Sequence, residues 1–304
     1  MNPRTLALAF PPGQVSREST PIFFAKICVF HRQKMESNLI FLKLGGSAIT
    51  DKTREATARE DVIRRVAREV KRAQDENPAL KLLIGHGSGS FGHFAAKRSG
   101  FGERGNWRAY AETGAAAARL NRLVADIFLA EGVPVVAMQP SASARCRDGE
   151  LVALAVEPIR TALAHNLVPL LHGDVAFDET RDMTIASTEM IFAFLAPILK
   201  PSHILLAGVV DGVFTADPLK DPKGSAQLIR EITLTNFPQI ESRLRGSHGV
   251  DVTGGMIAKV KITLALLERE PSIRVRVISA TCEGCITRAL TREDFDEGTL
   301  IHTA

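Results

Sequence analysis

Short apolar runs alternate with longer amphipathic segments from residue 38 to residue 304, and this alternation restricts the possible folds more than any other feature of the chain. The apolar runs are predicted to be buried strands at 39–44, 80–84, 133–138, 167–171, 203–207 and 273–279. The amphipathic segments are predicted to be helices at 58–75, 107–131, 157–165, 186–199 and 255–269. Strands separated by helices form a mostly parallel sheet covered on both faces. The sequence therefore predicts an α/β fold, a three-layer αβα sandwich.

The first helix carries a start signal as well as an apolar stripe. Thr57-x-x-Glu60 matches a capping box, in which the two side chains bond to each other's backbone amides. Asn77-Pro78 supplies the stop signal, because proline cannot continue a helix. The charges between these signals are interpreted as a solvated face.

Residues 1–37 differ from the rest of the chain. They show no sustained hydrophobic period and contain Pro3, Pro11, Pro12 and Pro21, so they are predicted to be a poorly ordered extension outside the fold. Residues 38–304 are long enough for one large domain, and we expect a single one.

Charge and cysteine content exclude several function classes. The net charge is +4, of which residues 1–38 hold +3, so the body of the chain lacks the basic stripe of a nucleic-acid-binding protein. The apolar run 21–30 is interrupted by Lys26 and is too short to cross a bilayer. Four cysteines, two of them in Cys282-x-x-Cys285 without a second pair, favour a reducing compartment and no zinc site. We expect a cytoplasmic protein that binds neither membranes nor nucleic acid.

Glycine turns follow four of the predicted strands directly, at 45–47, 85–93, 172–174 and 208–212. Ligands of such sheets bind at the carboxyl ends of the strands. Because glycine lets consecutive backbone amides face one anion, these turns are candidate phosphate cradles. A tight strand-to-helix turn explains Gly45-Gly46 equally well, and both interpretations stay open.

Lysines strengthen the phosphate interpretation. Lys43 precedes the first turn and Lys52 follows it, which places two positive charges at one rim. Lys259 lies one turn into a helix that begins at a glycine pair, another arrangement suited to anions. His93 closes the second glycine loop where a phosphate can dock, although a histidine bonded to its own loop is the alternative.

Other catalytic motifs fit less well. Gly87-x-Gly89-x-x-Gly92 is formally a dinucleotide fingerprint, but the acidic residue at the required spacing, Glu112, lies inside a predicted helix. The chain has no P-loop, and Ser141 and Ser143 lack a base at a recognised spacing. The stretch 211–218 offers a turn, an aromatic side chain and two carboxylates that can hold a nucleoside, or it is simply a polar loop.

Three motifs in this order resemble the amino acid kinase superfamily: Lys43-x-Gly45-Gly46-Ser47, the stretch 211–218, and Thr253-Gly254-Gly255-Met256-x-x-Lys259. The resemblance covers about residues 38–304. Within the superfamily, the loop ending in Phe91-Gly92-His93 is similar to that of isopentenyl phosphate kinases. The fold it implies is the amino acid kinase-like sandwich, with an acceptor-binding N-lobe at about 38–180 and a nucleotide-binding C-lobe at about 181–304.

The resemblance also implies an activity: transfer of the γ-phosphoryl group of ATP to isopentenyl phosphate, with Mg²⁺, by a homodimer. The implied catalytic residues are Lys43, Lys52 and His93. The implied nucleotide contacts are Lys43, Gly45, Gly46, Ser47, Ser88, Asp211, Phe214, Asp217, Gly255 and Lys259. The implied acceptor contacts are Gly87, Gly92, His93, Gly173 and Asp174. Ser187-Thr188-Glu189 departs from the acidic Gly-Asp pair of many relatives, and no protein metal ligand is assigned.

Two alternatives stay open. One is a fosfomycin-type or other small-acid kinase of the same superfamily. The other is a nucleotide-binding sensor or storage protein without catalysis, because one fold can serve several functions. Lys43, Lys52, His93 and Lys259 together in one chain favour a kinase.

Overall fold

The computed structural model describes residues 38–219, 221, 224–246 and 252–303. Contacts between Cα atoms group residues 35–304 into one compact unit. The prediction that residues 1–37 form an extension lies outside the described part of the chain.

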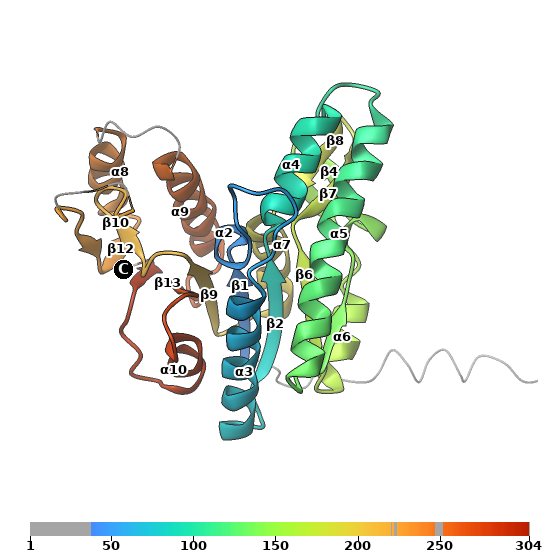
Figure 1. Cartoon of the computed structure of the whole chain (residues 1–304). Helices are drawn as coiled ribbons and strands as arrows, with labels where there is room; N and C mark the ends of the chain where they lie inside the picture. The colour runs from blue at the N-terminus through green and yellow to red at the C-terminus, as the bar shows by residue number, and fades with distance from the viewer. Residues whose placement is uncertain (1–37, 220, 222–223, 247–251, 304) are drawn as a thin grey trace, which may run out of the picture. The chain divides into compact units, whose positions relative to one another are not determined.

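The centre of the fold is an eight-stranded sheet in the order β12-β14-β13-β9-β1-β2-β6-β3 (Figure 1). Its strands are β1 (Leu39–Leu44), β2 (Lys81–His86), β3 (Val135–Ala137), β6 (Val168–His172), β9 (His203–Gly208), β12 (Glu231–Thr233), β13 (Arg274–Ser279) and β14 (Thr299–His302). All neighbours pair in parallel except β13 and β14. Every residue of β1 is buried, as expected for a strand with helices on both faces. The predicted mostly parallel sheet is confirmed.

Helices cover both faces of this sheet, which confirms the three-layer αβα sandwich. One face carries α2 (Gly46–Ile49), α3 (Glu60–Glu76), α4 (Gly89–Ser99), α5 (Trp107–Ala130) and α10 (Cys285–Thr291). The other carries α6 (Glu157–Ala164), α7 (Thr188–Leu199), α8 (Phe237–Gly246) and α9 (Val252–Arg269). Each face has its own apolar core, one including Leu42 and Phe128 and the other Phe41 and Phe192. Within the described residues, no helix is both long and apolar enough to cross a membrane.

Two smaller sheets were not predicted. A four-stranded sheet has the order β5-β4-β7-β8, from β4 (Arg145–Arg147), β5 (Glu150–Ala153), β7 (Asp174–Asp178) and β8 (Asp182–Ala186). β10 (Val213–Phe214) pairs with β11 (Leu228–Ile229). These strands are short and partly exposed, so they lack the continuous apolar run that marks the central strands.

The predicted capping box at the start of α3 is wrong. The N-cap residue is Arg59, and no side chain caps the helix. Thr57 makes other hydrogen bonds: its carbonyl accepts from Asp51 N at 2.9 Å, and its amide donates to Ser90 Oγ at 3.3 Å. The tertiary contact between this loop and α4 therefore overrides the local capping signal.

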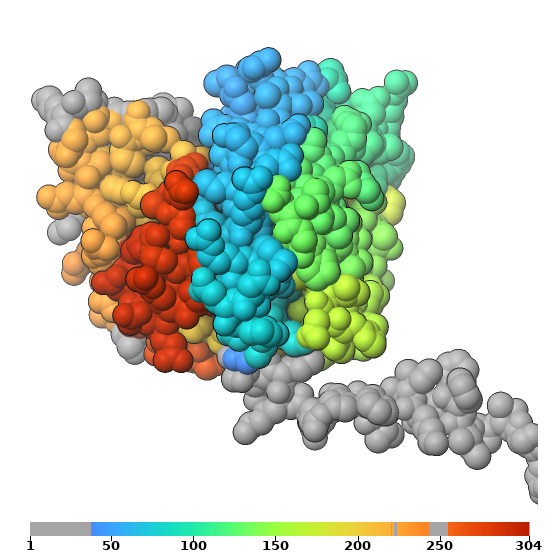
Figure 2. Space-filling view, turned by 60° about the horizontal axis from the view of Figure 1, so that its bottom comes forward, coloured from blue at the N-terminus to red at the C-terminus, as the bar shows by residue number. Residues whose placement is uncertain are grey.

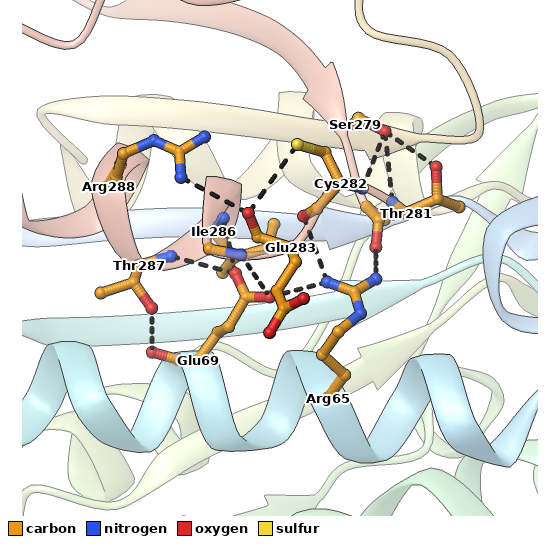
Figure 3. A network of polar contacts seen from close by, with 11 residues as sticks. Arg65, Glu69, Ser279, Thr281, Cys282, Glu283, Ile286, Thr287 and Arg288 are labelled. Carbon is orange, nitrogen blue, oxygen red and sulfur yellow. Dashed lines mark hydrogen bonds and ion pairs between the residues drawn. The ribbon is translucent and has the colours of Figure 1, made fainter.

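A buried carboxylate joins α3 to α10, which lie side by side in Figure 2. Glu69 of α3 accepts hydrogen bonds from the amides of Gly284, Ile286 and Thr287 at 2.9–3.3 Å (Figure 3). Arg65 pairs with Glu69 at 2.6 Å and also donates to the carbonyl of Cys282. Since these amides start α10 and have no partner within the helix, Glu69 satisfies them and fixes the position of α10.

Candidate active site

Two glycine loops touch at the carboxyl ends of β1 and β2. The amide of Gly45 donates to Ala207 O at 2.8 Å, which ties the first loop to β9. A Cβ atom on Gly46 would lie 2.7 Å from Gly89 N, so only glycine permits this approach. Gly89 has a φ of +53°, and a Cβ there would meet Thr50 Oγ1 at 2.2 Å. The first and second predicted loops therefore form one surface.

Lys52 and His93 lie close to each other because the loops beneath them are joined. Thr50 Oγ1 accepts from Ser90 N at 2.9 Å, which links the segment that carries Lys52 to the helix that carries His93. Burial and the positive charge of Lys52 lower the pKa of His93. Within the described residues the His93 ring makes no hydrogen bond, so the alternative of a histidine bonded to its own loop is not observed.

A buried ion pair occupies the centre of the rim. Lys43 Nζ lies 3.1 Å from Glu189 Oε1, with side-chain exposures of 6% and 12%. Burial raises the pKa of Glu189, but Lys43 and Lys259 lower it more, and the net shift is downward. The pKa of Lys259 is lowered by burial and by Lys43 and Lys52, against the opposing effect of Glu189. Lys43 and Lys259 act on this carboxylate and Lys52 acts on Lys259, so positive charge is in surplus here.

Glu189 is the site residue that sequence reasoning missed. It stands in the first turn of α7, after Ser187, whose side chain accepts from Met190 N as the N-cap. From the sequence alone, Glu189 stands out only as part of Ser187-Thr188-Glu189 and has no assigned role. A signal did exist, because Ser187-Thr188-Glu189 already stood out as a departure from the acidic pair that the resemblance implies.

A pocket opens beside the ion pair. Three predicted site residues line it: Lys43, Gly45 and Lys259. Its other lining residues are Glu189, Leu206, Ala207, Gly208, Met256, Val260, Thr263, Val277 and Ile301. A charged end and an apolar wall suit a ligand with a phosphate chain and a less polar part.

The remaining loop residues surround the same rim. A Cβ atom on Gly92 would meet Ser88 Oγ at 2.3 Å, so the start of α4 admits no side chain there. Gly173 donates to His86 O at 2.9 Å, which holds the third predicted loop beside the second. Ser47 lies in α2, between Gly46 and the buried Ala48.

Asp174 is buried and accepts from Ser141 N at 3.0 Å and from its own neighbour Val175 at 2.8 Å. Burial raises its pKa. Both oxygens therefore bond to backbone amides, and its observed contacts fix the turn that begins at Pro140; a contact with an acceptor stays a prediction.

Two buried histidines stack beneath these loops. The rings of His86 and His172 have centroids 5.7 Å apart. Burial lowers the pKa of each to about 4, so both are neutral at pH 7. His86 contacts Gly87 O at 3.1 Å and Asn121 Oδ1 at 3.0 Å. The ring nitrogens of His172 make no hydrogen bond among the described residues, and its Nε2 lies 3.6 Å from Asp174 Oδ2.

The predicted nucleoside loop lies farther along the rim, after β9. Asp211 is exposed, Phe214 belongs to the β10–β11 hairpin, and Asp217 accepts from Leu219 N at 3.0 Å. None of the three lines the lysine pocket. Gly255 is exposed in the first turn of α9, next to Met256, which does line it.

The Cys-x-x-Cys motif lies away from these loops. Cys282 is exposed, and burial raises the pKa of the Cys285 thiol to about 12. Across 38–219, 221, 224–246 and 252–303, no group of three or more histidine, cysteine or acidic side chains is placed to hold a metal ion.

Residues 38–279 match the family model "Amino acid kinase family". The chain belongs to the amino acid kinase family. It is 35% identical over 276 residues to an isopentenyl phosphate kinase of Methanothermobacter thermautotrophicus, covering 84% of this chain and 96% of the relative. It is also 35% identical over 232 residues to an isopentenyl phosphate kinase of Methanocaldococcus jannaschii, covering 73% and 85%. A solved isopentenyl phosphate kinase structure superposes with a TM-score of 0.72 at 33% identity, covering 87% of this chain and 100% of that one.

Proposed function

We propose that this protein transfers the γ-phosphoryl group of ATP to isopentenyl phosphate, giving isopentenyl diphosphate and ADP. The observation that carries the proposal is the convergence of Lys43, Lys52 and Lys259 on two touching glycine loops. The relatives select the acceptor, because those at 35% identity are isopentenyl phosphate kinases.

The reaction joins two anions, so its chemistry depends on charge neutralisation. An oxygen of the acceptor phosphate attacks the γ-phosphorus, and the bond from that phosphorus to the β-γ bridging oxygen breaks, leaving ADP. Such transfers need positioning and electrostatic stabilisation more than a covalent nucleophile. Lys43 and Lys259 bind the nucleotide phosphates, and Lys52 neutralises charge on the transferring group. Without these cations, repulsion between substrate and ATP opposes the reaction.

The acceptor phosphate is proposed to lie against the second glycine loop. Gly87, Gly92 and Gly173 leave room for it, and His93 donates a hydrogen bond from a ring that has no partner in the described structure. The pKa of His93 is lowered, so at pH 7 the ring enters the site neutral and donates through one N–H.

The two halves of the domain are proposed to bind different substrates. Residues 38–180 bind the acceptor and residues 181–304 the nucleotide, with Asp211, Phe214 and Asp217 at its nucleoside end, while Lys43 reaches the nucleotide phosphates from the first half. We also propose a homodimer, as the resemblance implies, and sedimentation equilibrium measures this directly.

Mg²⁺ is proposed to enter with the nucleotide. Glu189 is paired with Lys43, and protein sites for Mg²⁺ commonly use one or two carboxylates plus substrate phosphates. The donor set of the described residues therefore fits an ion carried mainly by ATP, which supplies charge neutralisation at the phosphate oxygens when bound.

ADP release in the presence of Mg-ATP tests the activity. The acceptors to compare are isopentenyl phosphate, fosfomycin, aspartate and acetylglutamate, each at several concentrations. We expect the highest kcat/KM with isopentenyl phosphate. A carboxylate or fosfomycin that reacts faster would assign the protein to the small-acid kinases, and binding of ATP without turnover of any acceptor would make it a sensor.

His93→Ala tests the acceptor site. Loss of a hydrogen bond to a phosphate in a desolvated site costs about 2 to 4 kcal/mol of transition-state stabilisation, or roughly 30- to 1,000-fold in kcat/KM. His93→Gln still donates from its amide and should recover part of the loss. Melting curves of both variants should match the wild type. Unchanged kinetics in His93→Ala would remove His93 from the acceptor site.

A further inference from the structure

A second cavity, of about 550 Å³, lies at the opposite end of the sheet from the lysine rim, which is the edge that carries Lys43, Lys52 and Lys259. It is formed at the amino ends of β1, β9 and β13, on the face that α3 and α10 cover. Its lining residues include Leu80, His203, Arg274, Arg276, Leu290 and Arg292. Ligand pockets in proteins have volumes of roughly 300 to 1,000 Å³, so this cavity has the size of a binding site.

Arginines give the cavity its charge. Arg274 and Arg276 alternate along β13 on the face that also carries the buried Ile278, where a central strand is expected to be apolar. Arg292 lines the cavity from the segment after α10, and Glu293 is the single acidic lining residue. Within the described residues, the side chains of Arg274 and Arg292 make no hydrogen bond or ion pair. Two guanidinium groups therefore line the cavity without a hydrogen-bond or ion-pair partner among the described residues, although the charge of Arg292 contributes to lowering the pKa of Glu297.

The walls of the cavity are held in place by other contacts. Arg276 donates to Glu297 O at 3.0 Å and lies over the Phe295 ring, 5.6 Å from its centroid. Arg288 pairs with the Glu297 carboxylate at 2.6 Å. Together with Glu69, which anchors the start of α10 in Figure 3, these contacts fix the segment that carries Arg292. A cavity whose walls are braced loses little entropy when a ligand binds.

The floor of the cavity is apolar. The β13–β9 register places Arg276 beside Leu205 and Arg274 beside His203. Burial and the two arginines lower the pKa of His203, which agrees with a positive potential in the cavity. Leu80, Leu290 and Leu300 complete the apolar surface.

We propose that this cavity is a second binding site, distinct from the lysine rim, for an amphipathic phosphorylated ligand: a phosphate or diphosphate head on Arg274 and Arg292, and an apolar chain on the leucines beneath them. Guanidinium groups match phosphate geometry in two parallel hydrogen bonds, which a lysine cannot supply. The site is separate from the catalytic loops because β13 carries its arginines at the amino end, about 16 Å from Ser279 at the carboxyl end.

Equilibrium dialysis of the full chain with geranyl diphosphate tests this proposal. The double variant Arg274→Ala/Arg292→Ala should bind one ligand fewer per chain than the wild type, through a loss of affinity at that site of at least about 30-fold. The number of ligands bound per chain falls by one whether or not the lysine rim also binds geranyl diphosphate. The outcome is therefore independent of the proposed catalytic function. The matched control, Arg119→Ala/Arg269→Ala, removes the same charge from exposed positions elsewhere and should bind like the wild type.

Two further probes define the ligand class. Pyrophosphate has the head alone and geraniol the chain alone, and each should bind the second site more weakly than geranyl diphosphate. Turnover of isopentenyl phosphate by the double variant should be unchanged, which shows that the fold is intact. Equal stoichiometry in wild type and double variant would overturn the site, and pyrophosphate binding as tightly as geranyl diphosphate would overturn the role of the apolar floor.

Discussion

Glu189→Gln is the change for which the structure gives the sharpest expectation. The substitution keeps the shape of the side chain but removes the carboxylate that lies 3.1 Å from Lys43 Nζ. Lys43 and Lys259 then remain together in a pocket where burial already lowers the pKa of Lys259. Breaking a fully buried pair costs roughly 3 to 5 kcal/mol, and because the pocket opens to solvent we expect about 2 to 4 kcal/mol here.

We predict that the nucleotide reverses this loss. In the proposed binding mode, ATP phosphates bring negative charge to the same lysines, so the ligand replaces part of what the carboxylate supplied. Binding to the native state stabilises it in proportion to the logarithm of ligand concentration over Kd. ATP should therefore stabilise Glu189→Gln more than it stabilises the wild type.

Thermal and urea denaturation, each with and without ATP, measure both effects. The variant without ATP should melt about 4 to 7 °C below the wild type, and the difference should shrink at saturating ATP. Glu268→Gln, an exposed glutamate on α9, is the control and should change neither value by much. A variant that melts with the wild type without ATP, or that gains no more from ATP than the wild type, would refute the assignment of Glu189 as the counter-charge of the lysine cluster.

Three further predictions concern catalysis, acid stability and the extension. Lys52→Ala should lower kcat more than it raises the KM for ATP, because a charge that serves the transferring group acts mainly in the transition state. Steady-state kinetics with varied ATP measure both constants, and a kcat at the wild-type value would disprove this role. Burial holds the pKa of His86 and His172 at about 4 in the folded chain, against 6.5 in the unfolded chain, so below pH 6.5 the unfolded chain binds more protons. The contribution of these histidines to the free energy of unfolding is therefore fully present above pH 6.5, and that free energy falls by about 3 kcal/mol per histidine toward pH 4. In His172→Leu, the midpoint of urea unfolding should fall less steeply with decreasing pH than in the wild type. An identical dependence on pH would contradict the assignment. A protein starting at Met35 should melt and turn over like the full chain, whereas a large loss of either would show that residues 1–34 contribute to the fold.

Six of the eight strands in the main sheet were predicted from their apolar runs, whereas β12 and β14 were missed because they are short and mix polar with apolar residues. The central strands were predictable because they are buried on both faces. Such strands appear as continuous apolar runs, and β1 begins and ends where the run Leu39–Leu44 does. The smaller sheet of β4, β5, β7 and β8 was missed because its strands carry charged residues and expose side chains such as Phe177. Their pairing is set by contacts across the fold that no local pattern records.

The candidate site, too, has features that local sequence predicts and features that only the folded chain creates. Glycine loops that follow strands could be predicted, because parallel strands bring their carboxyl ends to one rim. The Lys43–Glu189 pair could not, because the two residues are far apart in the sequence and meet only when α7 packs behind β1. The structure places Asp174 in backbone hydrogen bonds that spacing along the chain did not reveal.

Because the two glycine loops touch, the presence of glycine at these positions is weaker support for a phosphate-binding site. Gly46 must be glycine because its Cβ would strike the backbone of Gly89, and Gly92 because its Cβ would strike Ser88. Packing alone therefore accounts for residues that were first interpreted as a phosphate cradle, and a Gly46→Ala variant would lose stability whatever the site binds. The lysines admit no such explanation, since burying Lys43 and Lys259 beside one carboxylate costs free energy that an apolar core would not. The case for a polyanion at this rim thus depends on its cations, while the glycines bring those cations within reach of one ligand.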